Sequence, residues 1–225
     1  MTIPFALYTD GGLIGTNGDV ELGTYTWLQV DADGGYLAHE SGLVKPFPDK
    51  PVENNMVELC ALLRGLRSLP DGWSGTVYSD NVNALGWTRS RLKKSGQRYT
   101  QGGVPASLKP YIEKQMARLG SVAGVHLDGH PTDEELEKGT GHSGEPVHAG
   151  NRFCDDHCKA ERLKYQLVNG QGVYKLTRRE YARLTDDTKE VLLALGYAPP
   201  GCKKGARPMM TEEEADAAFE EAINA

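Results

Sequence analysis

Residues 7–12 read LYTDGG and residues 77–80 read VYSD. Each segment combines an apolar residue, a tyrosine, a small hydroxyl residue and an aspartate, at the end of a short run of β-forming residues. In open α/β sheets, functional groups gather at the carboxyl ends of the strands. If the two strands are parallel neighbours, Asp10 and Asp80 lie side by side.

The segments around these two strands predict a mixed α/β fold. Alternating and apolar runs predict strands over 3–9, 23–30, 36–44, 74–80 and 121–129. Helical spacing predicts helices over 54–69, 81–94, 105–119 and from Asn151 onward. The order begins as an antiparallel meander and continues into strands joined by helices, which need parallel crossovers. We therefore expect a five-stranded mixed sheet with helices on both faces, in which Asp10-Gly11-Gly12 forms a turn.

The predicted helix over residues 54–69 carries an acid in an unusual place. Asn54 or Asn55 can cap its start. Its leucines fall on one face, and Glu58 lies at the edge of that apolar stripe. A glutamate there is unfavourable unless it is paired or bound to a metal ion.

A fourth acid, Asp155, lies in the first turn or so of the helix that begins near Asn151. Together with Asp10, Glu58 and Asp80 it would make a cluster of mutually repelling carboxylates, which raises their pKa values. Two divalent cations would cancel that charge, and all-oxygen ligands suit Mg²⁺ or Mn²⁺ rather than Zn²⁺. Two such ions about 4 Å apart clamp the attacking and leaving oxygens of a phosphodiester. The cluster predicts a two-metal nuclease.

Five motifs in order resemble the ribonuclease H family, type 1, over roughly residues 1–165. They are TDGG (9–12), ENNMVEL (53–59), VYSDN (77–81), VHLDGH (125–130) and NRFCDD (151–156). The resemblance implies that Asp10, Glu58, Asp80 and Asp155 hold the metal ions. It also implies an assisting histidine after the last strand, which is His130 here, with His142 in the longer following loop as a rival.

The resemblance further implies the substrate, the RNA strand of an RNA–DNA hybrid, cut to leave 5′-phosphate ends. The main chain at Gly11 and Gly12 and the amides of Asn54 and Asn55 could read 2′-hydroxyls and sugar edges. A basic segment after the fourth strand would grip the DNA strand without sequence preference. Its members are Trp87, Arg89, Arg91, Lys93, Lys94, Arg98 and Tyr99.

Two other functions remain open on this sequence. One is a nuclease of the same fold acting on branched DNA, double-stranded RNA or single strands, and the other is a non-catalytic hybrid-binding module. Simpler structural roles are expected for several residues near the motifs. Asp156 is expected in solvent, Cys154 in the core, Trp27 and Trp73 in packing, and Asp128 at the end of its strand or at the edge of the site.

The bulk composition bounds the remaining expectations. Hydrophobic residues make up 39% and charged residues 25%, which is ordinary for a globular protein, and no apolar run is long enough for a membrane span. The start of the chain lacks the features of a signal peptide, so we expect a cytoplasmic protein. We also expect a monomer. We expect a catalytic domain over 1–168 and a helical extension of unassigned role over 169–225, with capping boxes at Thr177–Glu180 and Thr211–Glu214.

Overall fold

The structure is a computed structural model that describes residues 3–15, 22–46, 52–88, 90–91, 108–170 and 175–201, with only the backbone at 90–91. It forms two compact units, Met1–Cys158 and Lys159–Ala225. The division falls inside one helix, whereas the sequence places the domain boundary at residue 168, further along the same helix. None of the described helices is long and apolar enough to cross a membrane.

The first unit is built on one mixed sheet with the strand order β3-β2-β1-β4-β6-β5. The strands are β1 (Ala6–Ile14), β2 (Leu22–Val30), β3 (Tyr36–Val44), β4 (Gly75–Ser79), β5 (Ser90–Arg91) and β6 (Val122–His126). The first three are antiparallel neighbours, and β1, β4, β6 and β5 are parallel neighbours. The five predicted strands are present, and the two-residue β5 extends the sheet at one edge.

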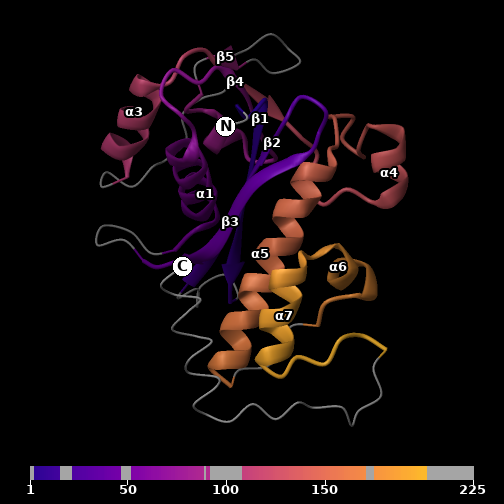
Figure 1. Cartoon of the computed structure of the whole chain (residues 1–225). Helices are drawn as coiled ribbons and strands as arrows, with labels where there is room; N and C mark the ends of the chain where they lie inside the picture. Colours follow the sequence, from indigo (N-terminus) through magenta and orange to yellow (C-terminus); the bar gives the residue numbers. More distant parts are fainter. Residues whose placement is uncertain are drawn as a thin grey trace. The chain divides into compact units, whose positions relative to one another are not determined.

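The two faces of the sheet pack against different helices, as predicted (Figure 1). Leu7, Tyr25 and Trp27 lie in the core under α1 (Asn54–Ser68). Their even-numbered neighbours Ala6, Tyr8, Leu28 and Val30 pack with Phe153 and Cys154 from the first half of α5 (Ala149–Val168). The alternation of side chains along a strand explains this division. Trp27, Trp73 and Cys154 are buried, which confirms their structural roles.

Strand β1 differs from its prediction at the residues of greatest interest. Asp10-Gly11-Gly12 does not turn, because β1 continues to Ile14 and stays paired with β2 throughout. Its pairing with β4 ends earlier, at Tyr8 opposite Tyr78. The continuous antiparallel partner outweighs the local turn preference of the Asp-Gly-Gly triplet. Asp10 therefore lies within a strand, beyond the point where the parallel partner ends.

Several helices also differ from their predicted form. Glu53 is the N-cap residue of α1, so Asn54 and Asn55 are its first helical residues and not its cap. The helix expected over 81–94 is the short α2 (Val82–Leu85), capped by the Asn81 side chain and ended at Gly86. The helix expected over 105–119 is α3 (Lys109–Arg118).

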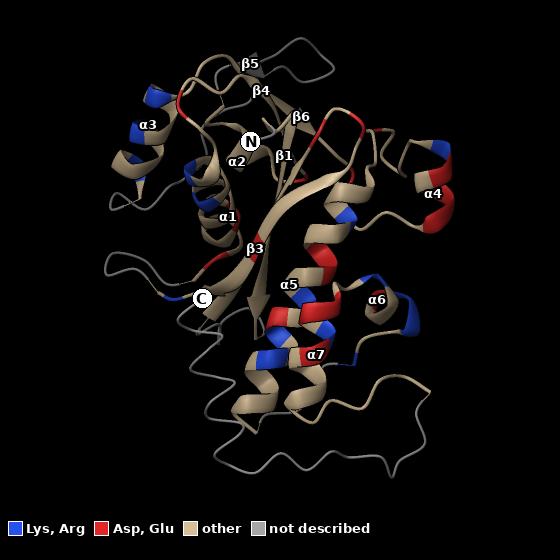
Figure 2. Ribbon diagram, in the orientation of Figure 1, with Lys and Arg blue, Asp and Glu red and all other residues tan. Residues whose placement is uncertain are grey.

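The polar loop after β6 contains a helix that the sequence reading missed. This helix, α4 (Asp133–Lys138), starts with a capping box between Thr132 and Glu135. Its first turn is acidic and Lys138 lies in its last turn, which suits the helix dipole (Figure 2). The T-x-x-E spacing was the available signal.

The second unit has a small apolar core of its own. The second half of α5 packs there with α6 (Arg178–Arg183) and α7 (Asp186–Ala194). The buried side chains are Ala160, Leu163, Leu176, Leu184, Leu192 and Tyr197. The predicted capping box between Thr177 and Glu180 is confirmed, and the one at Thr211–Glu214 lies outside the described residues.

Candidate metal centre

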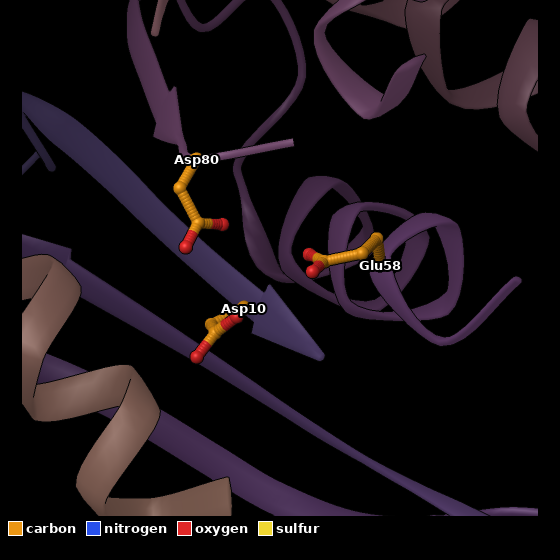
Figure 3. A group of neighbouring side chains, drawn as sticks. All are labelled: Asp10, Glu58 and Asp80. Atoms are coloured by element: carbon orange, nitrogen blue, oxygen red, sulfur yellow. The ribbon is translucent and has the colours of Figure 1, made fainter. Parts of the chain in front are cut away.

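Three carboxylates from distant parts of the sequence meet at one point in the first unit. Asp10 comes from β1, Glu58 from α1, and Asp80 directly follows β4. One oxygen from each lies within 4.8 Å of the others, and the three side chains are neighbours (Figure 3). Asp10 and Glu58 are buried, while Asp80 is partly exposed. The structure thus brings together three of the four acids that the sequence singled out.

Gly11 allows α1 to approach the strand closely enough for Glu58 to reach this point. A Cβ atom at Gly11 would lie 2.6 Å from the Glu58 backbone nitrogen and 2.6 Å from the Val57 carbonyl carbon. Any larger residue would therefore push the helix away from β1. The Gly11 amide also donates a 2.8 Å hydrogen bond to Oδ1 of Asp10, which orients that carboxylate.

The carboxylates perturb one another strongly. Burial raises the pKa of Asp10 well above its ordinary value, and the charges of Asp80 and Asp155 raise it further. Burial likewise raises the pKa of Glu58, with additional contributions from Asp10 and Asp80. Burial also raises the pKa of Asp80. These groups would release protons far more readily with a cation between them.

One atom of the cluster also lacks a partner. Oε2 of Glu58 is buried and accepts no hydrogen bond from any residue that the structure describes. A buried carboxylate oxygen in this state is strongly unfavourable unless something positive lies against it. The donor set is all oxygen, as Mg²⁺ and Mn²⁺ prefer. The residues present therefore fit a divalent cation held by Asp10, Glu58 and Asp80.

The fourth predicted acid, Asp155, stands beside this group on the first half of α5. It is 9% exposed, and its charge acts on both Asp10 and Asp80. Its Oδ1 lies 3.3 Å from Nδ1 of His130. The hydrogen bond with Asp155 raises the pKa of His130 to about 9, so this exposed imidazole is protonated at neutral pH. His130 has a positive φ of 50°, which is unusual for a residue other than glycine.

The rival histidine, His142, has different partners. Its Nδ1 lies 3.8 Å from Oδ1 of Asp128 and 3.8 Å from Oε1 of Glu135. Asp128 in turn accepts hydrogen bonds from the amide and the hydroxyl of Ser143, at 2.8 and 2.7 Å. Asp128 therefore ties the loop around residue 143 to the end of β6, in agreement with its structural role. Of the two histidines, His130 is the one joined to the acidic cluster.

The first predicted substrate contacts, at Gly11, Gly12, Asn54 and Asn55, lie at the start of α1 and in β1. Gly11, Gly12 and Asn55 are partly exposed and Asn54 is exposed. Asn55 accepts hydrogen bonds from the amides of Asn83 and Asn81, at 2.9 and 3.4 Å, so its carbonyl is already engaged.

The remaining predicted contacts lie in the segment after α2. Trp87 is only 7% exposed and packs in the core beneath α1, so the prediction that its ring meets nucleic acid is wrong. The apolar ring gains more from burial in that core than from a place beside the basic segment. The side chains of Arg89, Arg91, Lys93, Lys94, Arg98 and Tyr99 lie outside the described residues.

The start of α5 is more buried than its polar sequence indicates. Every residue from 151 to 158 is buried, so the expectation that Asp156 is solvated is wrong. Arg152, which the sequence reading missed, is also buried and bonds the Pro131 carbonyl and the Asp133 carboxylate. It thereby anchors the segment that directly follows His130. Charged residues of this kind give no sequence signal, because only the tertiary contacts compensate their burial.

Comparisons with known proteins agree with the motifs. No family model matches the chain. Over 143 residues it is 28% identical to the ribonuclease H of Syntrophus aciditrophicus (strain SB), which covers 59% of this chain and 73% of that protein. The relationship to ribonuclease H that the motifs indicate is thus confirmed.

The chain is also similar, at lower sequence identity, to solved structures of RNase H1 proteins. RNase H1 of the archaeon Halobacterium salinarum NRC-1 has a TM-score of 0.43 at 13% identity, covering 69% of this chain and 95% of that one. LC11-RNase H1 in complex with an RNA/DNA hybrid has a TM-score of 0.38 at 21% identity, covering 54% and 83%.

Proposed function

We propose that this relative of ribonuclease H is a metal-dependent endonuclease that hydrolyses the RNA strand of RNA–DNA hybrids. The observation that carries the proposal is the convergence of Asp10, Glu58 and Asp80 with their oxygens within 4.8 Å of one another. Buried acids that repel each other destabilise a fold unless they serve a charged ligand. A module that only binds nucleic acid has no need of them.

In the proposed enzyme, Asp10, Glu58, Asp80 and Asp155 hold two divalent ions, with Mg²⁺ as the expected metal and Mn²⁺ as a substitute. When bound, such ions make water nucleophilic at neutral pH and neutralise the oxygen that leaves phosphorus. The chain itself supplies the fixed frame for this chemistry. Gly11 sets the distance between β1 and α1, and its amide orients Asp10.

His130 supplies a mobile proton in the proposed reaction. Water attacks the phosphorus, the bond to the 3′-oxygen breaks, and the products carry a 5′-phosphate and a 3′-hydroxyl. The leaving oxygen needs a proton, and a protonated imidazole can donate one. His130 is protonated at neutral pH because its pKa is raised to about 9, and its exposed side chain can exchange that proton with solvent.

The proposed recognition of the hybrid uses groups at the edge of the acidic cluster. Asn54 and the main chain at Gly11 and Gly12 are at least partly exposed and can meet the sugar edges of the RNA strand. The basic residues from Arg89 to Arg98 would contact the DNA strand. This choice of substrate rests on the relationship to ribonuclease H.

The decisive test is cleavage of a labelled RNA–DNA hybrid with and without Mg²⁺, beside matched RNA–RNA and DNA–DNA duplexes. The expected result is Mg²⁺-dependent loss of the hybrid's RNA strand alone, with 5′-phosphate ends. Asp80→Asn serves as the control and should abolish it. Cleavage of another duplex would overturn the assignment of the hybrid as the substrate. Binding of the hybrid without any cleavage would show that the chain is a binding module.

A further inference from the structure

Two tyrosines and a histidine form an aromatic cluster next to the carboxylates. Tyr8 and Tyr78 are opposite each other in the parallel ladder of β1 and β4. Their rings are stacked, with centroids 4.8 Å apart and planes 13° from parallel. The ring of His148 lies 4.7 Å from that of Tyr78, and its Nδ1 is 2.9 Å from the Tyr8 hydroxyl.

Each member of the cluster is close in sequence to one of the acids or to its helix. Tyr8 precedes Asp10 by two residues, and Tyr78 precedes Asp80 by two residues. Tyr8 and Asp10 are on the same face of β1, because side chains alternate along a strand. Beyond the Tyr8–Tyr78 pair, β1 and β4 share no further paired residues in the described ladder. The stacked rings are thus the last lateral connection before the two aspartates.

His148 connects this pair to the helix of the fourth acid. Its carbonyl accepts hydrogen bonds from the amides of Asn151 and Arg152, at 3.1 and 3.4 Å, in the first turn of α5. Gly150 packs directly on the Tyr8 ring, since a Cβ atom there would lie 2.6 Å from Tyr8 Cδ2. The start of α5 is therefore held against β1 by a hydrogen bond at His148 and a close backbone contact at Gly150, both within the two turns that precede Asp155.

The protonation states suit this arrangement. Burial lowers the pKa of His148, so its ring is neutral at neutral pH and Nδ1 can accept a hydrogen bond. The Tyr8 hydroxyl lies 2.9 Å from that nitrogen and can donate the hydrogen bond.

We propose that Tyr8, Tyr78 and His148 form an aromatic clamp that positions Asp10, Asp80 and Asp155 against their mutual repulsion. The three are positioning residues, because they act through the carboxylates. The inference builds on the proposed metal site and names the part of the chain that sets its geometry. It also accounts for the repeated tyrosine-x-aspartate spacing at 8–10 and 78–80: pairing the tyrosines pairs the aspartates.

The first test needs no metal ion. In EDTA at pH 8, Tyr78→Leu removes the stack and should lower Tm. The clamp works against the repulsion between the carboxylates. In an Asp10→Asn background, where that repulsion is weaker, Tyr78→Leu should therefore lower Tm by at most half as much, which is a coupling between the two sites. The control cycle pairs Tyr78→Leu with Asp33→Asn, an exposed acid in the β2–β3 turn, and should be additive. An additive result with Asp10→Asn would overturn the clamp.

The second test measures Mn²⁺ affinity by calorimetry. Tyr78→Leu should weaken binding about tenfold, which corresponds to about 1.4 kcal/mol, while Tyr8→Phe keeps the stack and should weaken it about threefold. Tyr111→Leu, at an exposed residue of α3, should bind as the wild type does. Wild-type affinity in both clamp variants would contradict the clamp.

The two proposals fail differently. If the wild-type chain binds no divalent ion but the metal-free cycle shows coupling, the proposed metal site fails and the clamp stands. If the wild type binds and cleaves, while Tyr78→Leu keeps full affinity and its cycle is additive, the clamp fails and the nuclease stands.

Discussion

Nδ1 of His130 lies 3.3 Å from Oδ1 of Asp155, and this contact connects the exposed loop after β6 to the acidic cluster. His130 is the only non-glycine residue with positive φ among those that the structure describes. Backbone strain of this kind persists where surrounding contacts hold it in place, and Arg152 bonds the neighbouring Pro131 carbonyl.

Removing the charge of Asp155 should lower the pKa of His130 from about 9 toward its ordinary value, because the hydrogen bond to Asp155 is the main cause of the shift. NMR titration of the His130 imidazole resonances in the wild type and in Asp155→Asn measures this directly. The raised pKa also makes stability depend on pH. The contribution of His130 to the free energy of unfolding is complete at a pH below its ordinary pKa, and it is lost as pH rises through about 9. An unchanged His130 titration would show that other groups raise its pKa.

The two histidines should differ in turnover. His130→Ala should slow hybrid cleavage about a hundredfold, the usual scale for loss of a proton donor, because His130 contacts Asp155. His142→Ala should change it little, because its neighbours are Asp128 and Glu135. Single-turnover rates at saturating hybrid would measure both, and the reverse ranking would transfer the role to His142.

The metal-free protein should gain stability when one acid of the cluster is neutralised. The folded-state pKa values of Asp10 and Glu58 are raised above their ordinary values. Their contribution to the free energy of unfolding is therefore complete at a pH below the ordinary pKa values, and it is lost as pH rises through the raised pKa values. At pH 8 in EDTA, Asp10→Asn should raise Tm by roughly 2–4 °C, the shift that about 1 kcal/mol produces in a domain of this size. The gain should vanish near pH 4.

The same variant should lose the stabilisation that divalent ions give the wild type. Scanning calorimetry with and without Mg²⁺ at the two pH values would measure both effects. A lower Tm for Asp10→Asn in EDTA at pH 8 would contradict mutual repulsion.

Gly11→Ala should damage the metal centre without removing any of its ligands. The new methyl group would clash with the backbone at Val57 and Glu58, which cannot rotate away, so we expect a loss of about 1–3 kcal/mol and weaker metal binding. Gly12→Ala is the matched comparison, because its Cβ would meet mainly the hydroxyl of Thr24, a side chain. Urea unfolding and Mn²⁺ titration would compare the two; equal effects would remove the special role of Gly11.

The second unit should tolerate damage without loss of cleavage. Leu192 is fully buried in its small core, and Leu192→Ala should destabilise α7 by about 2–5 kcal/mol. Hydrogen exchange should show faster exchange in α7 and unchanged exchange in β1 and β4. The rate of hybrid cleavage should also stay the same. A matching loss of cleavage would make the second unit part of the active enzyme.

Much of the sheet and the acidic cluster is predictable from local patterns. The strand runs, the apolar stripe of α1 and the misplaced acid Glu58 point to a mixed sheet with Asp10, Glu58 and Asp80 together, and the structure has them so. Capping boxes are equally local, and Thr177 with Glu180 was predicted correctly.

The local signals failed where long-range partners decide the outcome. Asp10-Gly11-Gly12 reads as a turn, yet its pairing with β2 keeps it extended. Trp87 follows a helix far shorter than expected and enters the core. Asp156 is buried together with the residues around it at the start of α5, although an acid beside Asp155 reads as a solvated helix residue.

The sequence by itself determined the five main strands, the positions of the helices around them and the set of carboxylates expected to meet, since charge and periodicity are local properties of the chain. Only the tertiary structure decided how they meet: how closely α1 approaches Gly11, which histidine reaches Asp155, and that Tyr8 stacks on Tyr78. Those features depend on distances between elements, which are set by packing among residues far apart in the sequence.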